Sequence, residues 1–210
     1  MHPHLPERAE AMIRRLDRAT RRAGLDESAV SRVGSALRLA LGRRAALLSD
    51  DHHPQFLHPA RTALILLEDL GVTDPLILAA GALAETIDLE LTPGPREIEN
   101  ALGPEIRALV DQVPVPARAG DELVEALVIA DEPVRLIALA ERMDHARHLH
   151  LRPTHEWLAF HQLHCQVYLP IAQRTHPTLT RRYRWWCNMF QHRYLATLDP
   201  TPSPSDLLPT

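Results

Sequence analysis

Apolar residues recur at helical spacing along most of the chain. Between residues 6 and 22, for example, Ala9, Met12, Ile13 and Leu16 repeat at intervals of three and four positions, which is typical of an amphipathic helix. No segment alternates convincingly between apolar and polar residues with a period of two, the pattern of a half-buried strand. The sequence therefore predicts an all-α fold.

Proline, glycine and aspartate at the ends of the apolar segments set the expected helix boundaries. Proline favours the first turn of a helix, aspartate caps its start, and glycine commonly follows its end. The predicted helices are 6–22, 26–47, where Gly42 could break the helix, 59–70, 76–84, 95–102, 104–113, 123–130 after an Asp121 cap, 134–149, 154–175 with a kink at Pro170, and 177–198. The stretch 76–84 is almost entirely apolar, so it should form the buried centre, whereas 114–120 should be a loop.

Composition and charge narrow the function classes. The chain has 210 residues, enough for one domain with a substantial core. Its formal charge of −4 argues against general nucleic-acid binding, whose affinity comes mainly from neutralising phosphates. The chain start lacks the apolar core of a signal peptide, and no run of 18 apolar residues follows, so we expect a cytoplasmic protein without a membrane span.

All 23 residues counted as Lys or Arg are Arg. The absence of lysine excludes a Schiff-base enzyme, a P-loop nucleotide site and a protein-kinase site, because each needs an ammonium group at a fixed place.

The 13 histidines include groups that could bind a metal, since neutral imidazole is the commonest protein metal ligand. The segment 52–59 carries three of them just before a helix, where side chains can enter a cleft. Asp144 and His148 lie one helical turn apart and could share a metal. Together with His145 and His150, however, they are better explained as groups interacting with a helix C-terminus.

Two further groups are better explained by packing. His161, His164 and Cys165 lie within one helical turn, but no fourth ligand is in view. Cys187 is expected on a separate helix without CxxC spacing, which argues against a disulfide framework or a zinc knuckle. The basic-aromatic run Arg181–Trp186 could stack bases, but helical spacing sends its members alternately to core and solvent, which favours a solvated face with a buried tryptophan.

Carboxylates close the most apolar helix. Glu85 and Asp88 follow the stretch 76–84, and burying a carboxylate is costly unless it pairs or binds something. His58 lies one helix earlier, and Glu141 lies on a later apolar helix. One histidine and three carboxylates from three elements are typical of a hard-metal phosphohydrolase site.

Several segments follow one another in a familiar order. They are His-Pro at 58–59 leading into Ala-Leu-Ile-Leu at 63–66, Leu-Gly-Val at 70–72, Leu-Ala-Ala-Gly-Ala-Leu at 78–83, the segment 97–113, Leu-Ile-Ala-Leu-Ala-Glu-Arg-Met at 136–143, and Tyr-Leu-Pro-Ile-Ala-Gln-Arg at 168–174. This order resembles the HD-domain phosphohydrolases, and most closely the RelA/SpoT-type (p)ppGpp hydrolase domain and its small stand-alone relatives.

The resemblance implies a helical bundle of about eight to ten helices. A single HD-like domain would occupy 1–199, with N-terminal helices over 6–48, a core over about 37–174 and a C-terminal helix at 177–198. The Pro- and Ser-rich tail 200–210 is expected to be disordered.

The resemblance also implies a metal centre. Family members hold a divalent metal, typically manganese, with a His, an adjacent His-Asp pair and a distant Asp, while a Glu-Asp pair helps to activate water. Carried over, the first His falls on His58 and the His-Asp pair on Ala84 and Glu85. The distant Asp falls on Glu141, and the Glu-Asp pair falls on Asp88 and Leu89. Only the first histidine is retained, and a methyl group replaces the second imidazole. Loss of a ligand should weaken metal binding severely, since damage to the groups around a ligand alone costs roughly 10–100-fold.

We therefore predict a degenerate, non-catalytic HD-domain protein with a binding or regulatory role and no resident cofactor. A nucleotide-like ligand would be held by Arg61, Arg142 or Arg147, of which the last two match arginines common in the family's last helix. Arginine suits phosphate because its guanidinium donates two parallel hydrogen bonds. The three carboxylates beside these arginines would repel an anion, which favours a protein partner or another small molecule.

Two alternatives stay open. The chain could be an active nucleotide (pyro)phosphohydrolase, with Mn²⁺ or Mg²⁺ held by His58, Glu85 and Glu141 and a water positioned by Asp88. It could also be an all-α interaction module that uses the Arg181–Trp186 surface. The sequence leaves the oligomeric state open.

Overall fold

The computed structural model describes residues 5–48, 50–116 and 120–198. All regular structure in these ranges is helical, which confirms the predicted all-α class. The eleven α-helical segments of the described residues form ten helices, because two of the segments are joined end to end through a π-helical turn. Ten helices lie within the expected range. None of the helices in these ranges is long and apolar enough to cross a membrane. The predicted tail 200–210 lies outside the described residues.

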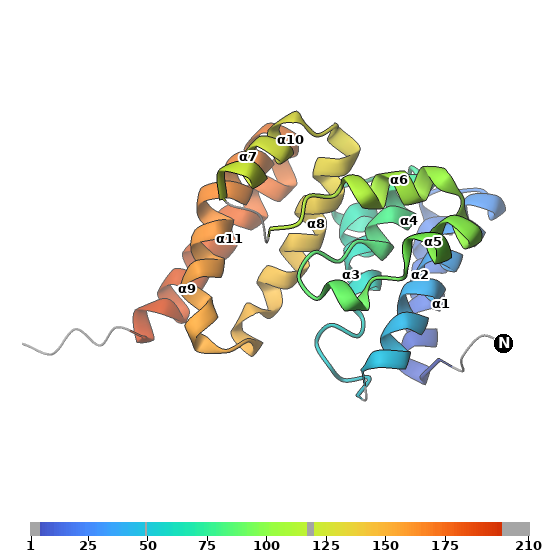
Figure 1. The fold of residues 1–210 in the computed structure, drawn as a ribbon, viewed down its shortest axis with the longest axis horizontal. Helices are drawn as coiled ribbons and strands as arrows, with labels where there is room; N and C mark the ends of the chain where they lie inside the picture. The colour runs from blue at the N-terminus through green and yellow to red at the C-terminus, as the bar shows by residue number, and fades with distance from the viewer. Residues whose placement is uncertain (1–4, 49, 117–119, 199–210) are drawn as a thin grey trace, which may run out of the picture.

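The elements follow one another in a simple order (Figure 1). They are α1 (Glu7–Arg22), α2 (Glu27–Leu47), α3 (His58–Leu64) with its π-turn η1 (Ile65–Asp69), α4 (Pro75–Leu83), the 3₁₀ turn η2 (Leu89–Leu91), α5 (Pro95–Leu102), α6 (Pro104–Gln112), α7 (Gly120–Ile129), α8 (Glu132–His148), the 3₁₀ turn η3 (Leu149–Leu151), α9 (Thr154–Leu163), the π-turn η4 (His164–Tyr168), α10 (Leu169–Thr175), α11 (Pro177–Arg193) and the 3₁₀ turn η5 (Leu195–Thr197).

Local signals account for several boundaries. The Asp26 side chain accepts a hydrogen bond from the backbone N–H of Ala29, and Asp74 caps α4 by accepting from Leu76. The expected break at Gly42 is wrong, because α2 runs unbroken through that position. A helical glycine costs only about 1 kcal/mol relative to alanine, and the buried face of α2 packs along α4, which offsets that cost.

Two other boundaries differ in detail from the expectation. Helix α7 begins at Gly120, inside the expected loop, and the side chain of the expected cap Asp121 lies outside the described residues. Instead of a simple kink at Pro170, the chain forms the π-turn η4 directly before it. Proline has no N–H to bond the carbonyl one turn earlier, so a widened turn at this place has a local cause.

Helix α8 is the central element of the fold. It contacts α3, α4 and α6 on one side and α10 and α11 on the other, and Figure 1 shows it between the N-terminal and C-terminal helices. Helix α4 is buried from Leu78 to Leu83, as its apolar sequence predicts. This packing brings the start of α3, the end of α4 and the middle of α8 together in the interior.

A second, smaller core lies between α9 and α11. Its buried members include Trp186, Cys187 and Phe190, with Trp157 and Phe160 packed against them. Trp185, in contrast, is 65% exposed. The run Arg181–Trp186 is thus divided between core and solvent, as its helical spacing predicts.

Helix α4 lies close to the π-turn η1 at Gly81. A Cβ atom at this position would lie 2.3 Å from Cδ1 of Leu66, and Leu66 is fully buried, so its side chain has no open space to move into. We expect Gly81→Ala to lower the free energy of unfolding by about 1–3 kcal/mol, the usual cost of overpacking a core.

Urea denaturation would measure this effect. Gly94→Ala is the matched control, because no atom lies within 4 Å of the added Cβ at that exposed position. Gly94 is the N-cap of α5, so its loss should be limited to the cost of an N-cap alanine, about 1 kcal/mol or less. Equal midpoints for the two variants would contradict the close packing of η1 on α4.

Candidate functional site

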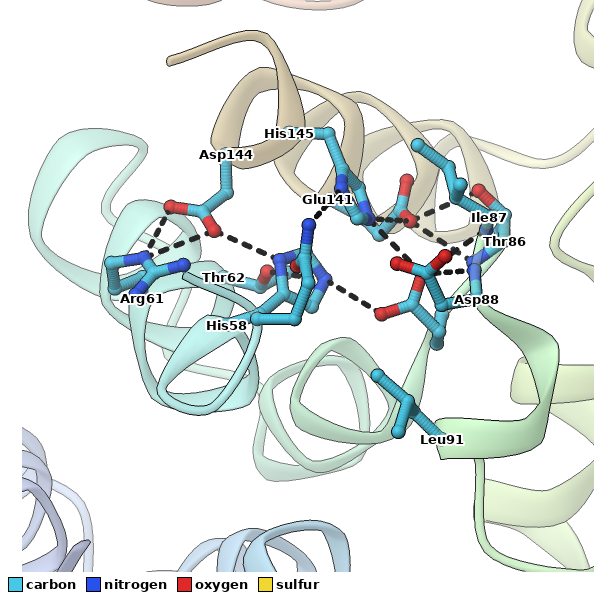
Figure 2. Close-up of polar contacts among 12 residues, drawn as sticks. His58, Arg61, Thr62, Thr86, Ile87, Asp88, Leu91, Glu141, Asp144 and His145 are labelled. Atoms are coloured by element: carbon cyan, nitrogen blue, oxygen red, sulfur yellow. Dashed lines mark hydrogen bonds and ion pairs between the residues drawn. The ribbon is translucent and has the colours of Figure 1, made fainter. Parts of the chain in front are cut away.

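The three predicted metal ligands come from three elements and meet in the interior. His58 is the first residue of α3, Glu85 follows the end of α4 by two residues, and Glu141 lies in the middle of α8. All three side chains are buried. His145, one turn after Glu141, joins them, and one ligand atom from each of the four residues lies within 4.8 Å of the others (Figure 2). The four residues thus form a cluster that could hold one metal ion.

Asp144 fixes the orientation of His58. Its Oδ2 atom lies 2.8 Å from Nδ1 of His58, and Nε of Arg61 donates to the same carboxylate at 2.8 Å. Burial alone would raise the pKa of Asp144, but the bonds from His58 and Arg61 hold it well below its usual range. An ionised carboxylate only accepts hydrogen bonds, so Nδ1 of His58 carries the proton. Nε2 therefore faces the cluster, 3.9 Å from Oε2 of Glu85.

Glu85 has a full set of donors. Its Oε2 atom accepts from Nη2 of Arg44 at 2.9 Å, and Arg44 is itself buried and donates to two backbone carbonyls. Oε1 accepts from the backbone N–H groups of Ile87 and Asp88 and lies 3.1 Å from Nε2 of His145. Burial would raise the pKa of Glu85, but the neighbouring histidines and Arg44 outweigh it and lower the pKa far below its usual range.

Glu141 is held in a similar way. Its Oε1 atom accepts from the backbone N–H and the hydroxyl of Thr86, at 3.0 and 2.9 Å, and lies 3.0 Å from Nε2 of His145. Oε2 lies 3.4 Å from Nε of Arg142, and among the described residues neither atom has a hydrogen-bond partner. Burial would raise the pKa of Glu141, but Arg142 and His145 lower it to about 2.

His145 lies between the two glutamates. Burial alone would lower its pKa, but the charges of Glu141 and Glu85 and their hydrogen bonds raise it to about 9, so the side chain is an imidazolium at neutral pH. Its ring lies 4.3 Å from the ring of His58. The Gln55 amide faces Nδ1 at 3.1 Å, and Oε1 of Gln55 has no partner among the described residues. Exchanging the positions of the amide nitrogen and oxygen of Gln55 would let Oε1 accept a hydrogen bond from the Nδ1–H group of His145.

The chain's own cations neutralise the buried carboxylates. Each carboxylate faces its own guanidinium, and the His145 imidazolium bridges two of them; the pairs are Glu85 with Arg44, Glu141 with Arg142, and Asp144 with Arg61. Of the six carboxylate oxygens, only Oε2 of Glu141 has no hydrogen bond among the described residues. A divalent metal would have to displace the His145 proton and several of these hydrogen bonds. As folded, the cluster fits internal cations better than a metal.

Asp88, the expected water-positioning residue, lies beside the cluster rather than in it. It lines a cleft of about 340 Å³ together with Gln55, His148 and Arg152, and its carboxylate lies 3.9 Å from Nη1 of Arg152. Burial and the nearby Glu85 charge raise its pKa. His148, one helical turn after Asp144 on α8, also lines this cleft.

The three arginines expected to bind phosphate divide into two groups. Arg142 is 1% exposed and points inward, where it donates to the hydroxyl and carbonyl of Thr86. Arg61 and Arg147 instead line a shared cavity of about 320 Å³. We call it the arginine cavity; its lining is Arg15, Arg61, Leu64, Ile65, Glu68, Asp69, Arg147 and Arg182.

Comparisons with known proteins agree with this architecture. No family model matches the sequence, and no curated protein matches it. Among solved structures, the chain is similar to one described as a metazoan ortholog of SpoT that hydrolyzes ppGpp and plays a role in starvation responses. The two chains are 18% identical with a TM-score of 0.63, over 78% of this chain and 96% of the other. The chain has a SpoT-like HD fold. The resemblance drawn from the order of segments is thereby confirmed for the fold.

Within the SpoT-like fold, sequence reasoning missed Arg44. It also wrongly assigned Asp144 and His145 to the helix C-terminus, because both side chains are buried and contact the cluster. Arg44 lies on the buried face of α2, seven residues after Leu37 and three after Leu41, so a charge on an apolar face was its signal. His145 follows Glu141 by four residues, which places both on one face of α8. Asp144, considered as a partner of His148, instead binds His58.

The His145 imidazolium makes stability depend on pH. Its pKa is about 9 in the folded state against an ordinary 6.5, so its contribution is complete below about pH 6.5 and is lost as the pH rises through 9. We expect the free energy of unfolding to fall between pH 7 and 10, and His145→Gln to remove most of this fall. The absence of lysine keeps other titrations in this range few.

Urea denaturation across this pH range, with NMR titration of the His145 ring, would measure the effect. His192→Asn is the control, because His192 is exposed on α11 and should leave the slope unchanged. A His145 ring that titrates near 6.5 would contradict the assignment of a buried imidazolium.

Proposed function

We propose that this chain is a non-hydrolytic protein of SpoT-like fold that binds a phosphate-bearing small molecule. The observation that carries the proposal is the charge balance of the buried cluster. Three carboxylates that would serve a metal are each paired with an arginine of the same chain, and the position of a ligand histidine is occupied by Ala84.

Two energetic terms oppose metal binding at the buried cluster, and we call a cluster neutralised in this way a closed centre. At pH 7, removing a proton from a group with a pKa of about 9 costs about 3 kcal/mol, and a metal would have to meet this cost before it could bind His145. The incoming divalent charge would also lie close to Arg44, which binds Glu85 at 2.9 Å. Both terms oppose metal binding, in addition to the missing imidazole at position 84.

Metal content and turnover test the closed centre. After purification with excess Mn²⁺, we expect substoichiometric manganese and no hydrolysis of ppGpp or p-nitrophenyl phosphate. The positive control combines His145→Asn with Ala84→His, Glu85→Asp and Glu141→Asp, which removes the internal cation and supplies the expected donors. One Mn²⁺ per unmodified chain with turnover, both abolished by His58→Ala, would overturn the proposal.

The arginine cavity is the site we propose for the phosphate group. Its four guanidiniums face two carboxylates, Glu68 and Asp69, of the π-turn η1. Asp69 lies 3.8 Å from Arg147 and also pairs with Arg182. Arg15 pairs with Glu68, and Arg61 is already bound to Asp144, so these four arginines exceed their three carboxylate partners by one positive charge. Charge-assisted hydrogen bonds from arginine to phosphate are among the strongest available. Internal neutralisation of the buried carboxylates also removes the repulsion expected from the sequence.

Arg61 connects this cavity to the buried cluster, because it lines the cavity and binds Asp144. A phosphate drawn to Arg61 would compete with Asp144 and so act on the orientation of His58. The proposed regulatory role rests on this connection.

Calorimetric titration with inorganic pyrophosphate and with ppGpp tests the cavity. We expect Arg182→Gln to weaken binding by about 10–100-fold, the value of one hydrogen bond to a charged group. Arg184→Gln is the matched control, because Arg184 is exposed two residues further along α11 and is not among the residues that line the cavity. Equal affinities for the two variants, or no binding by the unmodified chain at low salt, would contradict the assignment.

A second candidate function is supported by the convergence of His58, Glu85, Glu141 and His145 on one point. In that case the chain would be a metal-dependent (pyro)phosphohydrolase whose second imidazole comes from α8. The metal would polarise the phosphoryl group, His58 would be held by Asp144, and Asp88 would position water from the adjacent cleft. The manganese and turnover measurements decide between the two functions.

A further inference from the structure

Three soft ligands converge between α9 and α11, outside the buried cluster. His161 lies at the end of α9, Cys165 lies in the π-turn η4 and Cys187 lies on α11. One ligand atom from each lies within 4.8 Å of the other two. The sequence grouped His161 and Cys165 with His164, but His164 instead bonds the backbone carbonyls of Phe160 and Arg142. The folded chain supplies Cys187 in its place, from a helix more than 20 residues away.

The spacing of these atoms matches a zinc site. Bonds of about 2.3 Å to sulfur and about 2.0–2.1 Å to nitrogen, at tetrahedral angles, place a sulfur and a nitrogen about 3.5 Å apart. Sγ of Cys165 lies 3.4 Å from Nε2 of His161. The two atoms are therefore already at the separation that a shared metal would impose.

The surroundings are those of a partly closed site. His161 and Cys187 are buried, and Cys165 is half-buried, so access is from the Cys165 side. The His161 ring packs against Trp186 and Phe190, which fixes its plane.

One existing bond would be exchanged on metal binding. Nε2 of His161 donates to the carbonyl oxygen of Cys187 at 2.9 Å. A metal at this point would replace the Nε2 proton, and thiol and imidazole protons would be released as it binds. Since one ligand atom from each residue already lies within 4.8 Å of the other two, we expect the exchange to need only small side-chain shifts.

We propose that His161, Cys165 and Cys187 bind one thiophilic divalent cation of the zinc class. Three protein ligands leave the fourth tetrahedral position to water on the half-buried Cys165 side, as in zinc sites that keep an open position. The bound ion would tie α9 and η4 to α11 and stabilise the second core. This site shares no residue with the buried cluster or the arginine cavity, so it stands independently of the proposed function.

Cobalt substitution tests the site in the full reduced chain. Titration with Co²⁺ should give one equivalent of tetrahedral d–d bands with thiolate-to-cobalt charge transfer, and Zn²⁺ should displace them. The charge-transfer signal can come only from this site, because the chain has no cysteine besides Cys165 and Cys187. Zinc should also raise the midpoint of thermal unfolding.

Variants make the assignment specific. Cys165→Ser, at the half-buried position, should fold and lower zinc affinity by more than about 100-fold, since ligand loss exceeds the effect of damaged surroundings. His155→Asn is the matched control, because His155 is exposed on α9 and should leave the affinity unchanged. Absence of charge-transfer bands, bands that persist in Cys165→Ser, or a Cys165–Cys187 disulfide that forms in place of metal binding would each overturn the proposal.

Discussion

The imidazolium of His145 between Glu85 and Glu141 is the interaction on which the interior depends. It joins the end of α4 to the middle of α8, while Arg44 joins Glu85 to α2. Charges this deep are tolerated only when each is paired and hydrogen-bonded. Removing one partner from such a network typically costs 3–5 kcal/mol, a large part of the 5–15 kcal/mol that holds an ordinary domain together. The cluster is therefore a structural core made of charges.

The sequence was sufficient for the fold and for part of this cluster. Apolar spacing, with proline, glycine and aspartate at the ends of the apolar segments, predicted the helices, and the order of segments predicted the SpoT-like fold. His58, Glu85 and Glu141 do meet, as expected. What the sequence lacked was the partner of each charge. Helical spacing shows that Arg44 shares a face with Leu37 and Leu41, but only the packing of α2 on α4 shows that this face meets Glu85.

Ala84 does not leave the cluster without a second imidazole. In the sequence, alanine stands at the position expected for a ligand histidine. In the structure, His145 of α8 places an imidazole at the same cluster. An imidazole beside two carboxylates has two uses, as a neutral ligand or as a charged partner, and its surroundings decide which. Here Glu85 and Glu141 favour the charged form of His145, and we propose that this imidazolium, together with Arg44 and Arg142, takes the place of a divalent ion.

The shared use of Glu85 by Arg44 and His145 has an evolutionary consequence. A change at either cation alone leaves part of a buried carboxylate without a partner, so each single step away from the present arrangement is costly. Selection for a folded protein is therefore expected to preserve both cations, whatever ligand or reaction the chain serves.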